Sequence, residues 1–557
     1  MMPKLSAICA AVLVLLAVPA AAVGDAPSST ASQQSLAAEL DKLISPHYKA
    51  DAPGATVIVV KDGTTVFRKA YGLADVAHKV PLTPETSLRL GSITKQFTAA
   101  GILLLAQEGK LSLQDEITKH LPGYPTHGKK ITVEHLLTHT SGIVSYTGKP
   151  AYVETMARDV PVSAMIDSFK NDPLEFDPGS RYKYNNSGYF LLGAIIEKVS
   201  GQPYAKFLEQ RIFLPLGMQQ TAYEGHERGA GPRALGHSPQ EKHFGPSQPL
   251  SMTQPYAAGA LVSSVDDLAR WDAALASGKL LKEASWKQAT TPYRLSTGKP
   301  NTYAYGWDTG KLQGTPIIAH GGAINGFNTF ALRLPVEKVY VAVLSNSDSG
   351  VVRSDIVAKK AAALAIGKPY PEYKKVTLDA ASLDAYVGTY ELEELGQRIV
   401  RRDKDALVFE RPGRGALSLS AYSQDAFFLP GGLDHVKFSR DANGAVTNMI
   451  FYRDGNPVTG QRTGAAPPER TTAAVAHAAF DARVGRYELR PNFVIELSRE
   501  GDQFFAQASG QPRLEIFPAS ETVFFLKAVN AELHFEQGNN SSLTLKQNGL
   551  EIVGRKL

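Results

Sequence analysis

The sequence predicts an α/β sandwich, in which an antiparallel sheet packs against helices, followed by two small antiparallel β-barrels. Two observations support this prediction. Over residues 36–372, β-branched segments alternate with longer apolar or amphipathic segments of helical spacing. From Ala380 onward the chain consists of short alternating strands and turns, and this pattern occurs twice. The 557 residues, 43% of them hydrophobic, are enough for about three domains.

The first segment has the features of a secretory signal, which we place at residues 1–22. Lys4 supplies a positive charge, residues 5–18 form an apolar stretch too short to span a bilayer comfortably, and small residues precede Val23. Residues 23–35 are rich in Ala, Ser and Gln, which favours a flexible lead-in. We expect an exported protein, periplasmic or extracellular after cleavage. Retention of the segment as an N-terminal anchor is the alternative.

The composition argues against several classes of function. A formal net charge of +5 is small for 557 residues and does not favour a dedicated nucleic-acid surface. The one cysteine, Cys9, lies in the signal segment, so neither a disulfide framework nor a cysteine zinc site is expected. The sequence has no nucleotide-binding glycine motif and no further run apolar enough to cross a membrane. We therefore expect no cofactor, no metal, no nucleic-acid partner and no stable membrane span after processing.

The first strands of the sheet are predicted as a hairpin. Residues 56–60 and 65–67 are rich in β-branched and aromatic side chains, and Asp62-Gly63 between them is typical of a tight turn. A short strand over residues 87–90 then leads into a largely apolar helix that ends at Gly109. A helix that is apolar on most faces is usually buried, so this helix should lie in the core.

A short helix with two histidines follows, and it is expected to begin after Thr132 and to end before Gly142. His135 and His139 are four residues apart, a spacing that could place two metal ligands on one helix face. No glutamate lies between them as in a metalloprotease helix, so we interpret both as structural.

The remaining elements of the sandwich follow from the same periodicities. Residues 225–253 are rich in Gly, Pro, Ser and His, and a loop of that length inside a domain is usually functional. A strand over residues 316–319 is expected to end at His320. Other helical or amphipathic segments are expected over residues 36–43, 111–121, 189–199, 203–213 and 351–366 and from Ser264, and other strands over 305–307, 329–334 and 339–344.

The end of the chain contains a duplication. Tyr390 recurs as Tyr487 and Phe428 as Phe525, both at an offset of 97 residues, which indicates two copies of one all-β module. Each copy is long enough for about eight strands and hence for a small, lipocalin-like closed barrel. One large β domain with chance similarity is the alternative. The predicted boundaries are 36–372 for the sandwich, 373–463 for the first barrel, 464–474 for a linker and 475–557 for the second barrel.

Chemistry is predicted at the start of the apolar helix, where Ser92 and Lys95 are three residues apart. Residues at this spacing share a face only in a helix, so Ser92 should lie at the N-terminus with Lys95 one turn further in. The helix dipole favours negative charge on the serine oxygen, and burial lowers the pKa of the lysine so that it can accept a proton. This arrangement predicts an activated serine nucleophile, although the motif by itself also fits a capping serine and a solvated lysine.

Two further motifs follow, Tyr184-x-Asn186 and the triplet that begins at His320. A phenol between two cations would have a lowered pKa and could carry protons to a leaving group. The amide of Asn186 could orient a substrate amide. The glycines of the triplet, Gly321 and Gly322, would let a substrate backbone lie against the strand edge.

Backbone groups complete the predicted site. The N–H groups of Ser92 and Ala323 could form an oxyanion hole, in which one donor is typically worth about 3–4 kcal/mol.

With these three motifs in this order, the sequence resembles the serine β-lactamase and penicillin-binding-protein superfamily. The similarity is to the branch with class C β-lactamases, DD-carboxypeptidases, D-aminopeptidases and related esterases. It covers about residues 36–366 and includes the phrases at 135–142 and 191–193. It implies a sandwich of the serine β-lactamase/DD-peptidase type. It also implies roles for the site: Ser92 as acylated nucleophile, Lys95 as its base, Tyr184 as proton shuttle, and Asn186, His320, Gly321, Gly322 and Ala323 as substrate-binding residues.

One departure bears on the substrate. Class C β-lactamases have Lys-Thr-Gly where this chain has His320-Gly321-Gly322, and that lysine helps to hold the drug carboxylate. Histidine is mostly neutral at pH 7, so its hold on a carboxylate should be weaker. The resemblance therefore favours an exported peptidase or amidase that acts on D-amino-acid peptides through an acyl-enzyme. The alternatives are a carboxylesterase, a weak β-lactamase, and a non-catalytic protein that binds penicillin or cell wall.

The partners expected are a small peptide, amide or ester substrate and, through the barrels, other copies of the chain. The resemblance to D-aminopeptidases also suggests that a barrel loop shapes access to Ser92. The candidate loops are residues 430–432 in the first module and 537–540 in the second, although ordinary hairpin turns would have the same composition.

Overall fold

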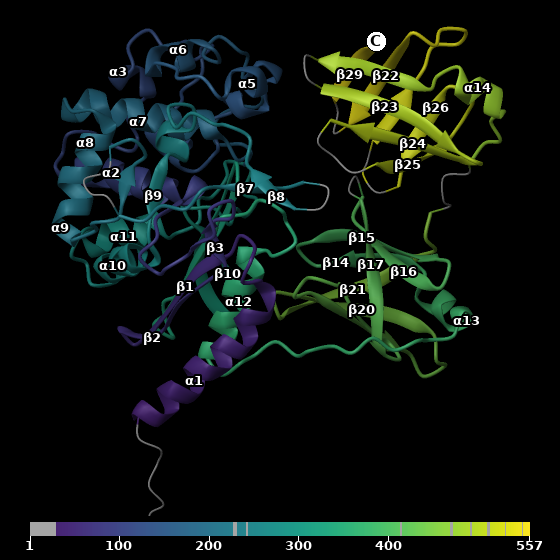
Figure 1. Ribbon diagram of the computed structural model, residues 1–557, viewed down its shortest axis with the longest axis horizontal. Helices are drawn as coiled ribbons and strands as arrows, with labels where there is room; N and C mark the ends of the chain where they lie inside the picture. The colour runs from purple at the N-terminus through teal and green to yellow at the C-terminus, as the bar shows by residue number, and fades with distance from the viewer. Residues whose placement is uncertain are drawn as a thin grey trace, which may run out of the picture.

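The structure, a computed structural model, describes residues 29–557 except 227–230, 241–242, 413–414, 468–471, 491–492, 510–512, 528, 530 and 548–549. The predicted signal at residues 1–22, with Cys9, lies outside the described residues, as do parts of the lead-in and of the linker. Figure 1 shows an α/β unit with two β-barrels beside it, which confirms the predicted fold class. Within the described part of the chain, no helix has both the length and the apolarity needed to cross a bilayer.

A six-stranded antiparallel sheet organises the α/β unit, in the order β10-β11-β12-β13-β1-β2. The predicted N-terminal hairpin is present, with Asp62 and Gly63 at positive φ in its turn, and β1 pairs with β13 from the far end of the domain. The strands are β1 (Ala55–Lys61), β2 (Thr64–Tyr71), β10 (Asp308–Leu312), β11 (Thr315–Ile324), β12 (Phe327–Leu334) and β13 (Val339–Ser345).

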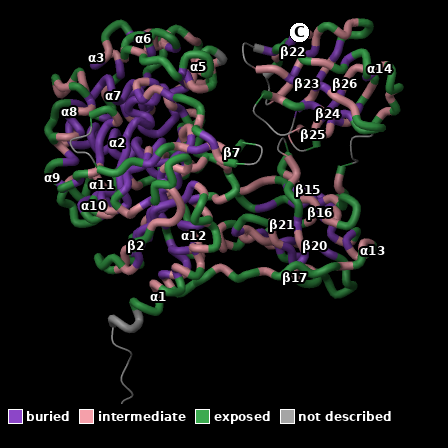
Figure 2. Tube along the Cα trace, viewed as in Figure 1, coloured by how far each residue is buried: buried purple, intermediate pink, exposed green. Residues whose placement is uncertain are grey.

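Helices cover both faces of this sheet because its central strands are apolar on both sides. On β13, Val341 and Val343 face α1 (Ser29–Ile44) and α12 (Ser354–Ala365), whereas Ala342 and Leu344 belong to the core on the other face. Figure 2 shows the buried residues concentrated between these layers. Because α1 begins at Ser29, residues 29–35 of the predicted flexible lead-in are helical.

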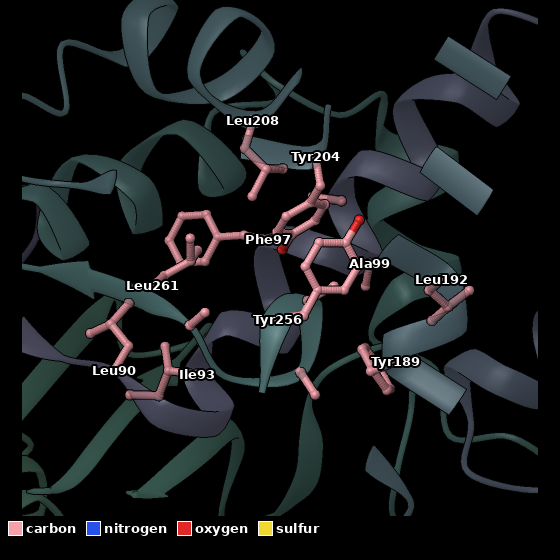
Figure 3. Close-up of a cluster of buried hydrophobic side chains, with 14 of the residues drawn as sticks. Leu90, Ile93, Phe97, Ala99, Tyr189, Leu192, Tyr204, Leu208, Tyr256 and Leu261 are labelled. Atoms are coloured by element: carbon pink, nitrogen blue, oxygen red, sulfur yellow. The ribbon is translucent and has the colours of Figure 1, made fainter. Parts of the chain in front are cut away.

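The second core is built around α2 (Thr94–Gln107), the apolar helix of the sequence analysis. Every residue from Thr94 to Leu105 is buried, as the lack of a polar face predicts. The helix packs against α7 (Asn186–Ser200) among the aromatic and leucine side chains drawn in Figure 3. This packing fixes the position of Lys95, the second residue of the helix.

Shorter elements complete the unit. Of the amphipathic segment at residues 111–121, only 117–120 form a helix. The other helices are α3 (Ile117–His120), α4 (Val133–Leu137), α5 (Pro150–Thr155), α6 (Val162–Asp167), α8 (Tyr204–Leu208), α9 (Leu214–Leu216), α10 (Val265–Ala276) and α11 (Glu283–Ala289). The minor strands are β3 (Leu73–Asp75), β4 (Val80–Pro81), β5 (Leu88–Arg89), β6 (Ala222–Tyr223), β7 (His237–Pro239), β8 (Phe244–Pro246) and β9 (Leu261–Ser263).

Two strand predictions need correction. Residues 305–307 form a turn, because Gly306 has φ +84° and lies so close to α2 that a Cβ would be 2.8 Å from the Lys95 carbonyl oxygen. The strand predicted to end at His320 continues to Ile324, because its pairing with β12 extends that far. His320 therefore lies within β11.

Each C-terminal module is a closed barrel of eight strands, and the duplication is visible in the packing. Tyr390 and Tyr487 are both fully buried, and each hydroxyl donates to the carbonyl four residues earlier, at Tyr386 (2.9 Å) and Arg483 (2.7 Å).

The first barrel follows α13 (Ala380–Leu383) and consists of β14 (Gly388–Leu392), β15 (Gly396–Asp403), β16 (Ala406–Glu410), β17 (Ala416–Ser423), β18 (Ala426–Phe428), β19 (His435–Arg440), β20 (Val446–Arg453) and β21 (Asn456–Gly464). The second follows α14 (His477–Asp481) and consists of β22 (Gly485–Arg490), β23 (Phe493–Glu500), β24 (Gln503–Ala508), β25 (Leu514–Pro518), β26 (Val523–Leu526), β27 (Ala531–His534), β28 (Ser542–Gln547) and β29 (Leu550–Lys556).

The first barrel contacts the α/β unit on the side of α12. Its β20–β21 turn hydrogen-bonds to the β10–β11 turn through Asp454 and Gln313, and Asp454 also pairs with Lys359 of α12 at 2.9 Å. Residues 431 and 432 line a cavity of about 670 Å³ together with side chains of α1 and α12. This cavity lies on the opposite face of the sheet from α2. The expectation that the 430–432 loop covers the entrance to Ser92 is therefore wrong, whereas nothing tests the 537–540 loop.

Candidate active site

Ser92 lies in a 3₁₀ turn, η2 (Gly91–Ile93), directly before α2, as the motif predicts. Glycines on both sides let this turn pack against β11. Gly91 has φ +54°, and a Cβ there would be 3.1 Å from the backbone nitrogen of Ala323. A Cβ on Gly322 would be only 2.0 Å from the carbonyl oxygen of Leu90. Gly322 is thus required for contact between β11 and the serine turn, which is a different reason from the substrate contact that we predicted.

Lys95 has no exposed surface and its Nζ has three neighbours. It lies 3.1 Å from Ser92 Oγ, 2.8 Å from Asn186 Oδ1 and 2.8 Å from the carbonyl oxygen of Ala258. Burial lowers the pKa of Lys95 well below its usual value. A neutral amine has two N–H donors and one lone pair. Because the amide and carbonyl oxygens can only accept, they take both donors of the neutral form, which leaves its lone pair for the hydroxyl of Ser92.

Tyr184 approaches Ser92 from the other side. Its hydroxyl interacts with that of Ser92, and its ring centroid is 4.8 Å from Lys95 Nζ. Desolvation raises the pKa of Tyr184, and the bond to Ser92 opposes this shift only in part. The expectation of a lowered pKa is wrong, because desolvation of the phenol is the largest effect and His320, one of the two groups thought to be cations, is a neutral imidazole. Tyr184 is therefore a protonated phenol near neutral pH.

His320 is buried, with 3% of its surface exposed, and both of its nitrogens have partners. Its Nδ1 lies 2.6 Å from the carbonyl oxygen of Gly321 and its Nε2 lies 2.8 Å from the hydroxyl of Tyr303. Because a carbonyl only accepts, Nδ1 carries the proton and Nε2 accepts from the phenol. Burial lowers the pKa of His320 to about 3. The imidazole is therefore neutral at any pH near neutrality.

The end of β11 forms an edge beside Ser92. In the described sheet β10 pairs with residues 315–319 of β11, while residues 320–324 pair with β12 alone. Their other side lies towards η2, against which β11 packs. Ala323 belongs to this edge, and its backbone nitrogen lies close to Gly91, the residue before Ser92. The two residues of the predicted oxyanion hole, Ser92 and Ala323, therefore lie on segments that are in contact. Its role towards a substrate remains a prediction.

Asn186 is the first residue of α7, and its side chain is held on both sides. Oδ1 accepts from Lys95, and Nδ2 donates to Thr147 Oγ1 at 3.1 Å. One Nδ2 hydrogen is directed at Thr147, and the amide has a second that a substrate carbonyl could take. The amide thus orients the lysine, while its predicted substrate contact is not tested.

The two histidines of the α4 segment have structural contacts. Thr132 and His135 form a capping box at the start of α4, which confirms the predicted cap and the structural interpretation of His135. His139 is buried and its Nδ1 accepts from the backbone N–H of Asn185. Among the described residues there is no group of three His, Cys, Asp or Glu side chains that could hold a metal ion.

The site also contains groups that sequence reasoning did not assign. The carbonyl of Ala258 holds Lys95, but a backbone carbonyl carries no signal in the sequence. Tyr303 holds His320, and His139 packs its ring 4.3 Å from that of Tyr184, measured between centroids. The sequence places His139 four residues after His135, but only the contact to Tyr184 shows the relation of His139 to the site.

Comparisons with known proteins agree with the fold. A family model described as beta-lactamase matches residues 40–365, and one described as a domain of unknown function (DUF3471) matches residues 372–462. Penicillin-binding protein 4* of Bacillus subtilis (strain 168) is 31% identical over 437 residues, which cover 73% of this chain and 94% of that protein. Protein flp of Staphylococcus aureus (strain N315) is 31% identical over 322 residues, which cover 56% of this chain and 64% of that protein.

Solved structures show the same likeness. The octameric penicillin-binding protein homologue from Pyrococcus abyssi has a TM-score of 0.54 and 27% sequence identity, and the match covers 78% of this chain and 100% of that one. The D-amino acid amidase from Ochrobactrum anthropi SV3, complexed with L-phenylalanine amide, has a TM-score of 0.51 and 25% identity, with 60% and 97% covered. The two family models together include the α/β unit and nearly all of the first barrel.

Proposed function

Because this chain belongs to the beta-lactamase family, within the serine β-lactamase and penicillin-binding-protein superfamily, we propose that it is a serine hydrolase that forms an acyl-enzyme on Ser92. The observation that carries the proposal is the set of three contacts around Lys95 Nζ. In the neutral form that the lowered pKa of Lys95 favours, they leave a lone pair for the serine hydroxyl, which is what a general base requires.

The proposed reaction begins when Ser92 Oγ attacks the substrate carbonyl carbon and its proton passes to Lys95. The developing oxyanion lies at the backbone N–H groups of Ser92 and Ala323, whose donors are fixed by η2 and β11. The protonated phenol of Tyr184, next to Ser92, supplies a proton to the leaving nitrogen, and the proton on Lys95 replaces it. The C–N bond breaks, and the amine leaves. Water then attacks the acyl-enzyme with the same groups in reverse.

We propose peptides or amides that contain D-residues as the substrate class. The similarity to a D-amino acid amidase supports this choice, and so does the neutral imidazole at His320, which provides no fixed cation for a penicillin carboxylate. A carboxylesterase would use the same geometry and is the second candidate. Export to the periplasm or beyond, and assembly through the barrels, remain parts of the proposal; one similar structure is described as octameric.

A panel of substrates tests the proposal. We expect kcat/KM to be highest for D-aminoacyl-nitroanilides or D-Ala-D-Ala peptides, lower for nitrophenyl esters of matched acyl group relative to their intrinsic reactivity, and lowest for nitrocefin. Esters alone being turned over would favour the carboxylesterase. A protein that is neither active on the panel nor covalently labelled by a fluorophosphonate would be a binding protein rather than a hydrolase.

The substitution His320→Lys is expected to raise acylation by penicillins about tenfold relative to uncharged esters. An ionised partner for the drug carboxylate typically contributes about 1.5–3 kcal/mol, which is the size of this effect. The measurement is the ratio of acylation rates for benzylpenicillin and a nitrophenyl ester. His320→Gln, which also removes the imidazole but adds no charge, is the matched control. A ratio that does not differ between the two variants would show that residue 320 is not at the carboxylate site.

A further inference from the structure

We infer that His139 is a positioning residue that holds the hydroxyl of Tyr184 at Ser92. The inference rests on the proposed function, since it assigns to His139 an effect on proton transfer. His139 itself does not contact Ser92; it acts through the residues on both sides of Tyr184.

His139 forms hydrogen bonds with the residues before and after Tyr184 in the chain. The carbonyl of His139 accepts from the backbone N–H of Lys183 at 3.0 Å, and its Nδ1 accepts from the backbone N–H of Asn185 at 3.1 Å. One residue thus fixes the backbone N–H groups of both chain neighbours of the catalytic tyrosine, Lys183 and Asn185. Asn185 then caps α7 by accepting from the N–H of Gly188 at 2.7 Å, so the turn is also continuous with a buried helix.

The imidazole ring also packs against Tyr184. Its centroid lies 4.3 Å from the Tyr184 ring, 4.5 Å from that of Tyr303 and 5.0 Å from that of Tyr189. Only 1% of the residue is exposed. The ring therefore limits the rotation of the Tyr184 side chain from behind, while the hydrogen bonds fix its backbone.

The unpaired Nε2 of His139 indicates that the hydrogen bond accepted by Nδ1 is the reason for a histidine at this position. The other nitrogen, Nε2, is buried without a hydrogen-bond partner among the described residues, and burial of an unpaired polar group is unfavourable. An apolar ring would fill the same space without that cost but could not accept from Asn185. Burial lowers the pKa of His139 well below its usual value, so the imidazole is neutral and Nδ1 stays an acceptor.

The backbone of His139 restricts the substitutions that can test this role. Its φ is +57°, in the left-handed region that Asn tolerates better than most residues. Asn also places Oδ1 at the same distance from Cβ as Nδ1 of histidine, so His139→Asn preserves the acceptor and the backbone but removes the ring. His139→Phe preserves a ring and removes the acceptor.

We expect both variants to lower kcat for an amide substrate about 10- to 100-fold with KM changed less than threefold, because small displacements of a catalytic group have effects of this size. In a Tyr184→Phe background the same substitutions should change kcat less than twofold, since no hydroxyl remains to be positioned. The control is His135→Asn, which removes the histidine of the preceding helix, α4, outside the site and should leave kcat within twofold.

Equal losses in the two backgrounds, or variants with the kcat of the parent enzyme, would overturn the inference. A crystal structure of His139→Asn gives a readout that does not depend on activity: we expect the Tyr184 hydroxyl to have moved out of hydrogen-bond distance of Ser92, and an unmoved hydroxyl would overturn the inference. Failure of the proposed function appears separately, as a wild-type protein that hydrolyses nothing on the panel and is not labelled at Ser92.

Discussion

Ser92→Ala should reduce turnover of any substrate by a factor on the order of 10⁴ or more, because loss of a nucleophile leaves only binding and oxyanion stabilisation. The variant should remain folded. Lys95 Nζ keeps its contacts with Asn186 and the carbonyl of Ala258, so removing the hydroxyl leaves the buried amine with two of its three partners. The side chain of Ser92 does not cap α2, so we expect a loss of unfolding free energy of no more than about 1 kcal/mol.

The measurement for Ser92 is intact mass after treatment with a fluorophosphonate, together with kcat/KM on the best substrate of the panel. Ser87→Ala is a matched control, because Ser87 lies on the same segment and is buried, with its hydroxyl bonded to the Gln220 carbonyl rather than to the site. The control should be labelled and active. A covalent adduct that persists in Ser92→Ala would refute the assignment of the nucleophile.

Lys95→Met and Tyr184→Phe should each lower the acylation rate by about 10³-fold, and the double variant should be little slower than either one. The reason is geometric: the amine and the phenol share a single hydroxyl, that of Ser92, so proton transfer fails as a whole when either partner is missing. The Tyr184 effect should be larger on amides than on nitrophenyl esters, because a nitrophenolate leaves without being protonated.

Lys95 also predicts the acid side of the pH profile. The amine must be neutral to accept a proton, and its lowered pKa means that it is protonated only as the pH falls through that value. kcat/KM for acylation should therefore fall as the pH is lowered through the pKa of Lys95, and this fall should be absent from Lys95→Met. Thermal unfolding is the control for a general loss of stability, because Lys95→Met leaves Asn186 Oδ1 and the Ala258 carbonyl without their buried donor.

For the double variant of Lys95 and Tyr184, losses that multiply would show that the two residues act independently.

The sequence by itself determined the local features of this protein. The spacing of Ser92 and Lys95 on an apolar segment is enough to predict a buried helix with both groups on one face, since helical geometry links residues three apart. The 97-residue repeat predicted two barrels because each copy carries its own alternating pattern. The hairpin around Asp62-Gly63 and the cap at Thr132 were predictable for the same reason: neighbours along the chain decide them.

Only the tertiary structure decided features that depend on distant neighbours. The pKa of Tyr184 is raised by desolvation, and His320, one of the two groups to which we assigned a charge, is a neutral imidazole once it is buried. The turn at residues 305–307 results from close packing of Gly306 on α2, and the 430–432 loop lies on the far side of the sheet from the site.

The contacts that complete the site are of the same kind. The carbonyl of Ala258 that holds Lys95 is 163 residues away in the chain, and His139 is 46 residues from the amide that it accepts from. Desolvation and hydrogen bonding act through space. The type of a residue and its spacing in the sequence therefore do not predict which distant groups the fold brings within about 3 Å of it.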